Sequence, residues 1–66
     1  MITDLQRFVG RTVSIVSDDG QLFYGKVTDY FLPEDNENGI ESIVIEKSDG
    51  DLVEFVAEDI RTIEMI

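Results

Sequence analysis

The chain has 66 residues and carries 15 acidic side chains against 5 basic ones, a formal charge of −10 at neutral pH. This length predicts one domain, residues 1–66, and domains of this size usually need a disulfide, a metal or self-association for added stability. The sequence contains no cysteine and no histidine, which excludes disulfides, thiolate metal sites and the most common acid–base side chain. We therefore expect the chain to gain stability by forming a homo-oligomer.

The charge and the hydropathy pattern also restrict the partners. The sequence has no apolar run of about 18 residues, the length needed to span a membrane. Its N-terminal stretch, MITDLQRF, lacks the basic start and apolar core of a signal peptide. These features predict a cytoplasmic protein with no membrane partner. The excess of acids opposes binding to RNA, which is a polyanion, and is compatible with either a basic protein partner or simple solubility.

A short helix is predicted at the N-terminus, over residues 3–9. Thr3 and Gln6 have the spacing of a capping box, in which two side chains satisfy free backbone N–H groups of the first turn. Leu5 and the apolar residues that follow it recur at helical spacing. Gly10 suits the left-handed conformation in which many helices end.

From Arg11 onward the apolar residues recur at every second position, which predicts strands joined mainly by tight turns. Five such strands are expected, with the sequences RTVSIVS, QLFYGKVTDYFL, IESIVIEK, LVEFVA and RTIEMI. The core is predicted from their alternating apolar side chains, which are Val13, Ile15, Phe23, Val27, Ile43, Ile45, Val53, Phe55 and Ile63.

Two glycine positions predict how the second strand begins and bends. Asp19 and Gly20 form a dipeptide typical of a type I′ hairpin turn, in which both residues have positive φ. Gly25 lies inside the strand, where glycine usually marks a bulge, a sharp bend or a close approach of another backbone. In a small closed sheet, such a bend allows one long strand to serve both walls.

The segment from Pro33 to Gly39 is rich in turn-forming and acidic residues and predicts an exposed loop. Its oxygen-bearing side chains partly match the spacing of a calcium-binding loop. However, Ile45 occupies the position that should supply a bidentate carboxylate, and strands rather than helices flank the loop. We therefore expect no metal ion here and no cofactor elsewhere in the chain.

The pattern after Gly20 is the most specific feature of the sequence. Counting from that glycine, the chain provides an aromatic at Phe23, a glycine at Gly25, an apolar residue at Val27 and a second aromatic at Tyr30. This pattern resembles the first motif of the Sm and Sm-like (LSm) proteins, and the likeness extends over nearly the whole chain. The resemblance implies a mainly β fold, with a short N-terminal helix followed by a strongly bent five-stranded antiparallel Sm-like or SH3-like small barrel. It also implies rings that form when neighbouring subunits pair their edge strands.

The RNA-contacting positions of that family are largely not reproduced. The residue after Tyr30 is Phe31, where the family has an acidic residue, and Val56 and Ala57 stand where the family has an Arg-Gly pair. The guanidinium group that would contact phosphate or base is therefore missing. Two asparagines in the acidic loop remain as substitutes for the family's RNA-contacting asparagine. The resemblance supports the fold and disfavours RNA as a partner.

Two sets of side chains are candidates for contacts with a partner. Apolar residues of the presumed outer face either form an association surface or are half-covered by neighbouring elements. These residues are Val16, Val44, Val56 and Met65. The second set either offers an aromatic face for stacking nucleobases or packs as ordinary strand residues. It consists of Tyr24, Tyr30 and Phe31, and the two tyrosines are assigned to one face of the second strand.

No catalytic set is visible, because the chain lacks histidine, cysteine and a nucleophile motif. The adjacent acids at residues 18–19 and 58–59 lie in predicted turns, where aspartate is expected for backbone reasons. The leading hypothesis is a non-enzymatic module that self-associates through its edge strands. The alternatives are an atypical Sm-like RNA-binding protein and an acidic docking module for a basic protein partner.

Overall fold

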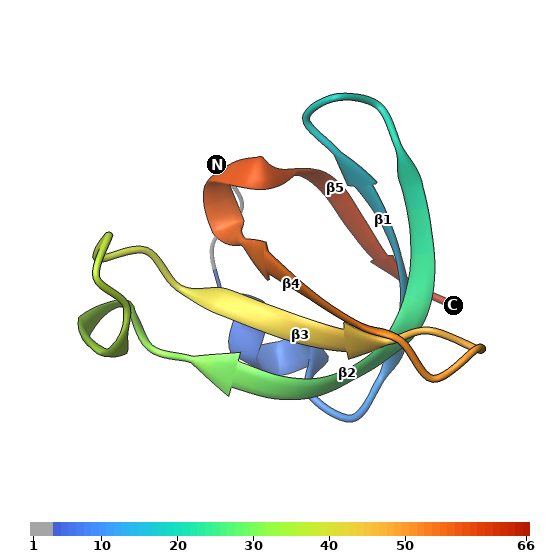
Figure 1. The fold of residues 1–66 in the computed structure, drawn as a ribbon, viewed down its shortest axis with the longest axis horizontal. Helices are drawn as coiled ribbons and strands as arrows, with labels where there is room; N and C mark the ends of the chain where they lie inside the picture. Colours follow the sequence, from blue (N-terminus) through green and yellow to red (C-terminus); the bar gives the residue numbers. More distant parts are fainter. Residues whose placement is uncertain (1–3) are drawn as a thin grey trace.

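The computed structural model describes residues 4–66 as one strongly bent antiparallel sheet of five strands (Figure 1). The strands are β1 (Thr12–Ser17), β2 (Leu22–Phe31), β3 (Ser42–Glu46), β4 (Leu52–Val56) and β5 (Ile60–Met65). Three short 3-10 turns complete the chain, namely η1 (Leu5–Phe8), η2 (Pro33–Asp35) and η3 (Ala57–Asp59). The sheet order is β4-β3-β2-β1-β5. The predicted mainly β fold with five antiparallel strands is therefore confirmed.

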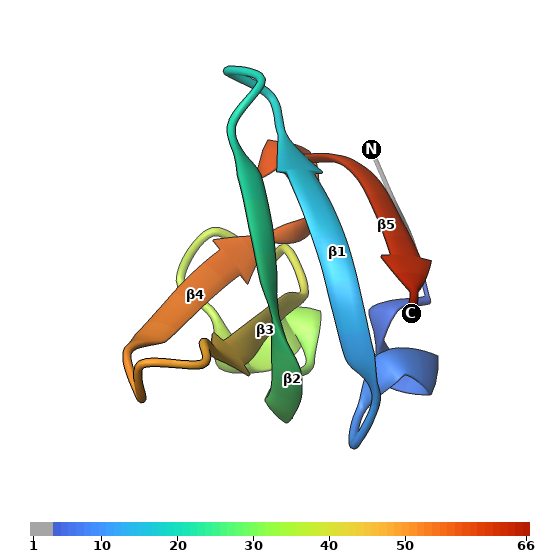
Figure 2. The same cartoon turned by 90° about the vertical axis from the view of Figure 1, so that its right-hand side faces the viewer.

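The connection between β4 and β5 explains why the sheet is bent. These strands lie at opposite edges of the sheet, yet only the three residues of η3 connect them. Neighbouring strands are about 4.8 Å apart, so the edges of a flat five-stranded sheet would be about 19 Å apart. The extended chain between the end of β4 and the start of β5 reaches at most about 14 Å. The sheet must therefore curl until its edges approach each other at η3 (Figure 2).

The curled sheet remains open between its two edge strands, β4 and β5. Within residues 4–66, β4 and β5 are not hydrogen-bonded neighbours, although the chain passes directly from one to the other. The sequence predicted a small barrel, and closure of the sheet into a barrel is not confirmed. Two unpaired strand edges face outward as a result.

Strand β2 serves both halves of the sheet, as its central glycine predicted. At Lys26, β2 passes from pairing with β1 to pairing with β3, because this residue pairs with Thr12 of β1 and with Glu46 of β3. At Gly25 a Cβ atom would lie 2.7 Å from the carbonyl oxygen of Glu46. A side chain at this position would therefore collide with the backbone of β3, so the sequence-based expectation of a close approach is correct.

The N-terminal segment forms a 3-10 turn rather than the predicted helix. Asp4 precedes the turn with a φ of 63° and makes no side-chain capping bond. The acceptor for the Leu5 N–H is instead Oε1 of Glu41, at 2.8 Å, from a distant part of the chain. The predicted capping box involves Thr3, which lies outside the described residues. Gly10 does adopt the expected left-handed conformation, with a φ of 82°.

The two tight hairpins contain three-residue loops instead of the predicted type I′ turn. Gly20 has a φ of 86° and its N–H donates to the carbonyl of Ser17, while the Ser17 N–H donates to the carbonyl of Gln21. Asp19 does not share the positive φ, since Asp4 is the one non-glycine residue with that geometry in the described chain. This pattern matches hairpin loops in which one left-handed glycine closes a turn. The loop at residues 48–50 repeats it.

The core lies on the concave side of the bent sheet, where η1 covers it. Six of the nine predicted core residues are buried, and Phe23, Val53 and Ile63 are half-buried and pack against them. Leu5 and Phe8 of η1 are also buried. The sequence did not predict Ala57 and Ile60, which are buried at η3 and the start of β5. Among residues 4–66, no helix has the length and apolar character needed to cross a membrane.

Candidate functional site

The open edge of β4 presents three residues whose backbone groups face away from the sheet. The Ala57 N–H donates to the carbonyl of Glu41, and the carbonyl of Asp51 accepts from the Lys47 N–H. Because backbone groups alternate in direction along a strand, the residues between these points direct theirs outward. They are Leu52, Glu54 and Val56.

The opposite edge is the outer side of β5. The Ile66 N–H donates to the carbonyl of Thr12 at 3.0 Å, so the same alternation turns the backbone groups of Ile63 and Met65 outward. Apolar side chains accompany both edges, since Leu52 on β4 is 66% exposed and Met65 on β5 is 45% exposed. Unpaired edges of this kind are templates for pairing with another strand.

The predicted association residues lie on four different strands. Val56 and Met65 lie on the two edges, whereas Val16 and Val44 lie on the interior strands β1 and β3. Val44 stands in register between two acidic residues, one on β2 and one on β4. No two of the four residues are direct partners in the described ladders, although Val44 and Val56 are diagonal neighbours on one face of β3 and β4.

The predicted aromatic face is divided by an irregularity in β2. The register with β3 shifts between Val27 and Asp29, which turns Tyr30 toward the core. The Tyr30 hydroxyl donates to Oε2 of Glu41 at 3.2 Å. Burial and, next, this hydrogen bond raise the pKa of Tyr30 above its usual value. Tyr24 remains 55% exposed, so the two tyrosines do not share a face as the sequence had suggested.

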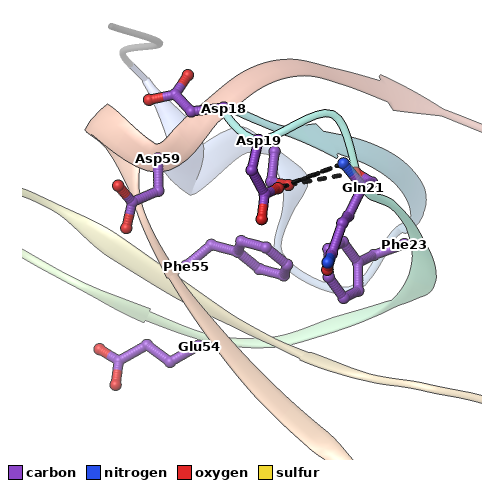
Figure 3. A pocket seen from close by; sticks show the side chains of 8 residues that line it. Asp18, Asp19, Gln21, Phe23, Glu54, Phe55 and Asp59 are labelled. Carbon is purple, nitrogen blue, oxygen red and sulfur yellow. Dashed lines mark hydrogen bonds between the residues drawn. The ribbon is translucent and has the colours of Figure 1, made fainter.

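A pocket of about 360 Å³ lies between the β1–β2 hairpin and the corner formed by β4 and η3 (Figure 3). Half of its lining residues are acidic and none is basic. Within the described residues 4–66, the lining consists of Ser17, Asp18, Asp19, Gln21, Phe23, Glu54, Phe55 and Asp59. The rings of Phe23 and Phe55 meet edge to face, with centroids 5.0 Å apart. The pocket therefore combines an aromatic wall with four acidic lining residues, of which Glu54 turns its carboxylate away to accept from the Ser42 hydroxyl.

The walls of this pocket are tied together by hydrogen bonds. The Ser17 hydroxyl and the Gln21 N–H donate to Asp19, and these two bonds hold the pKa of the Asp19 carboxyl below its usual value. The Asp18 N–H donates to the carbonyl of Asp59 at 2.9 Å, which joins the hairpin to η3. The guanidinium of Arg61 donates to the carbonyl of Asp18 at 2.5 Å.

Little in the sequence indicates this pocket. Its acids come from two turns and one strand that are distant along the chain, and each is locally explained by turn chemistry or exposure. The pairs at residues 18–19 and 58–59 were the available signal, because both flank the corner where the sheet curls. Only the topology shows that one short connector brings them together.

The acidic loop shows no metal geometry. The side-chain amide of Asn36 donates to the carbonyl of Ile40 at 2.7 Å and to the hydroxyl of Ser42 at 3.1 Å. Oδ1 of Asn38 accepts from the Ile40 N–H. These bonds hold the loop over β3. Within residues 4–66, no group of three or more acidic, histidine or cysteine side chains is placed to hold a metal ion.

Comparisons with known proteins give no relative for this chain. No family model matches it, no curated protein matches it, and no solved structure matches it.

Proposed function

We propose that this chain is a non-enzymatic Sm-like assembly module, whose copies associate by pairing the β4 edge of one copy with the β5 edge of the next. The supporting observation is the pair of open edges on one small sheet, each with outward backbone groups and an exposed apolar side chain. Edge pairing would satisfy those groups and bury apolar area that a 66-residue chain cannot cover by itself. In this proposal the neighbour's strand completes the barrel that one copy leaves open.

The two edges differ, so this contact joins unlike surfaces. A contact of this type generates a ring when the rotation between copies closes, and an open filament when it does not. Each added copy brings a further net charge of −10. Mutual repulsion between copies weakens association at low ionic strength, and added salt screens it. We therefore expect self-association to strengthen as salt rises.

The direct test is the molar mass in solution, measured by light scattering coupled to size exclusion at low and high salt. The expected result is an oligomer whose population grows with salt and with protein concentration. A strict monomer at high concentration in both buffers would refute the proposal.

Substitution of Val56 by proline tests the β4 edge specifically. Val56 has a φ of −81°, close to the value that proline imposes, and its N–H faces away from β3. Val56→Pro therefore removes one outward donor without breaking the internal ladder. Val56→Ala shortens the same side chain but keeps the N–H, which makes it the matched control. We expect Val56→Pro to lower the molar mass and Val56→Ala to retain the oligomer.

Binding of RNA in the manner of an atypical Sm-like protein remains the alternative. Two observations count against it, namely the orientation of Tyr30 toward the core and the engagement of Arg61 with the β1–β2 hairpin. The alternative predicts that single-stranded RNA is retained at low salt and released at high salt. This salt dependence has the opposite sign to that of self-association, so one salt series distinguishes the two functions.

A further inference from the structure

The open β4 edge and the acidic pocket are parts of one surface. Glu54 belongs to both, because its backbone faces outward from the edge and the residue borders the pocket, while its carboxylate points away from the Phe55 ring and accepts from the Ser42 hydroxyl at 3.0 Å (Figure 3). The next residue, Phe55, contributes its ring to the pocket wall. A strand added to β4 would therefore lie directly beside the pocket.

We propose that this surface binds an extended, basic segment of another protein, which adds as a strand to β4 and places one arginine or lysine side chain in the pocket. The backbone groups of Leu52, Glu54 and Val56 supply the hydrogen bonds of strand addition, a recognised mode of peptide binding. Side chains directly opposite each other on paired strands share a face of the sheet. The segment residue opposite Phe55 thus projects to the same side as the Phe55 ring, into the pocket.

The chemistry of the pocket selects a cation at that position. Asp18, Asp19 and Asp59 line it, and within residues 4–66 no basic residue does. The hydrogen bonds from Ser17 and Gln21 favour the charged form of Asp19. The phenyl rings of Phe23 and Phe55 provide aromatic surface of the kind that attracts a guanidinium or ammonium group. The pocket volume of about 360 Å³ leaves room for the end of a long basic side chain.

This inference rests on the geometry of the β4 edge and not on self-association. The basic segment and the β5 edge of a second copy would use the same backbone groups of β4, so each excludes the other. Binding of the segment would consequently dissociate an oligomer that is built through β4.

The probe is a blocked heptapeptide of alternating threonine and arginine, labelled for fluorescence anisotropy and titrated with the full chain. We expect binding that weakens as salt rises. A second peptide, with proline in place of its two central threonines, keeps the charge but loses strand-pairing donors. It should bind much more weakly. Equal binding of the two peptides would overturn the proposal, because it would show that charge attraction alone accounts for binding.

Two double variants of equal charge locate the site. Asp18→Asn with Asp59→Asn neutralises two pocket carboxylates, whereas Asp35→Asn with Glu37→Gln neutralises two exposed acids of the loop after β2. We expect the pocket variant to weaken the arginine peptide by about five- to tenfold and the loop variant by less than about twofold. Equal weakening by both variants, or no binding by the unmodified chain, would refute the site. Circular dichroism establishes that both variants remain folded.

The outcomes also separate this inference from the proposed self-association. A chain that remains monomeric but binds the arginine peptide refutes self-association and supports the docking site. A chain that assembles but does not bind the peptide refutes the docking site alone.

Discussion

Replacement of Gly25 by alanine tests whether the close approach of β2 to β3 determines the bend of the sheet. The new Cβ would lie 2.7 Å from the carbonyl oxygen of Glu46 and 3.2 Å from Cβ of Ile45. A comfortable contact between carbon and a carbonyl oxygen is about 3.3 Å or more, so the strands would have to separate by about half an ångström. The colliding atom belongs to the backbone of a paired strand and cannot rotate away.

The expected cost follows from two opposing effects. Forcing one extra carbon into a packed site costs about 1–3 kcal/mol. Alanine restricts the unfolded chain more than glycine and returns about 0.5–1 kcal/mol. The central net loss is therefore about 1.3 kcal/mol in the free energy of unfolding. For a domain of this size, that loss lowers the melting temperature by about 5–10 °C.

Urea unfolding followed by circular dichroism measures this loss, and Gly50 provides the control. No atom lies within 4 Å of a Cβ built at Gly50, but its φ of 89° disfavours any side chain. Asparagine tolerates that conformation better than alanine does. Asparagine should therefore be milder than alanine at Gly50, whereas at Gly25 it should be at least as harmful. A loss below about 0.5 kcal/mol for Gly25→Ala would refute the steric argument, since that is the range of neutral surface substitutions.

Three further predictions concern hydrogen bonds described above. Glu41→Ala removes the acceptor of the Leu5 N–H and should cost about 1 kcal/mol of unfolding free energy, as loss of a capping side chain does. Glu41→Gln keeps an acceptor oxygen and should cost less. Equal losses for the two variants in urea unfolding would contradict the role of Glu41 as acceptor of the Leu5 N–H. Since Ser17 and Gln21 lower the pKa of Asp19, its ionised form stabilises the fold above the ordinary aspartate range, and that contribution disappears as pH falls through the lowered pKa. Unfolding measured from pH about 5 to about 2 should therefore show a smaller acid-induced loss for Asp19→Asn than for the unmodified chain. Since burial and the bond to Glu41 raise the pKa of Tyr30, its neutral form stabilises the fold below the ordinary tyrosine range, and that contribution is lost as pH rises through the raised pKa. Tyr30→Phe should abolish this alkaline loss, and an unchanged pH profile above about pH 10 would show that Tyr30 does not cause it.

Local signals in the sequence were sufficient to predict most of the sheet. Alternating apolar residues gave the strands, and Gly25 indicated the close approach, because both depend on near neighbours in the chain. The turn at Asp19 and Gly20 was placed correctly, but its type was wrong. Two-residue and three-residue hairpin loops share the Asp-Gly signature, and only the backbone geometry distinguishes them.

The errors arose where distant residues decide the structure. The N-terminal segment showed a helical pattern, yet its first N–H is satisfied by Glu41, which lies 36 residues away. An irregularity after Val27 changes which side chains of β2 face the core. Counting every second residue along the strand therefore placed Tyr30 on the wrong face. The acidic pocket was not foreseen because its walls come from separate turns that meet only when the sheet curls. Contacts between such distant residues produce no periodic pattern in the sequence.

The short connector η3 has a consequence for the size of any assembly. It limits how far apart the two edge strands of one copy can lie, and in a ring built from unlike edges the angle between those strands sets the rotation from each copy to the next. In the proposed assembly, the three residues Ala57–Asp59 would therefore contribute to the number of subunits. Lengthening this connector, without altering either edge, would change the symmetry of the ring rather than the strength of its contacts.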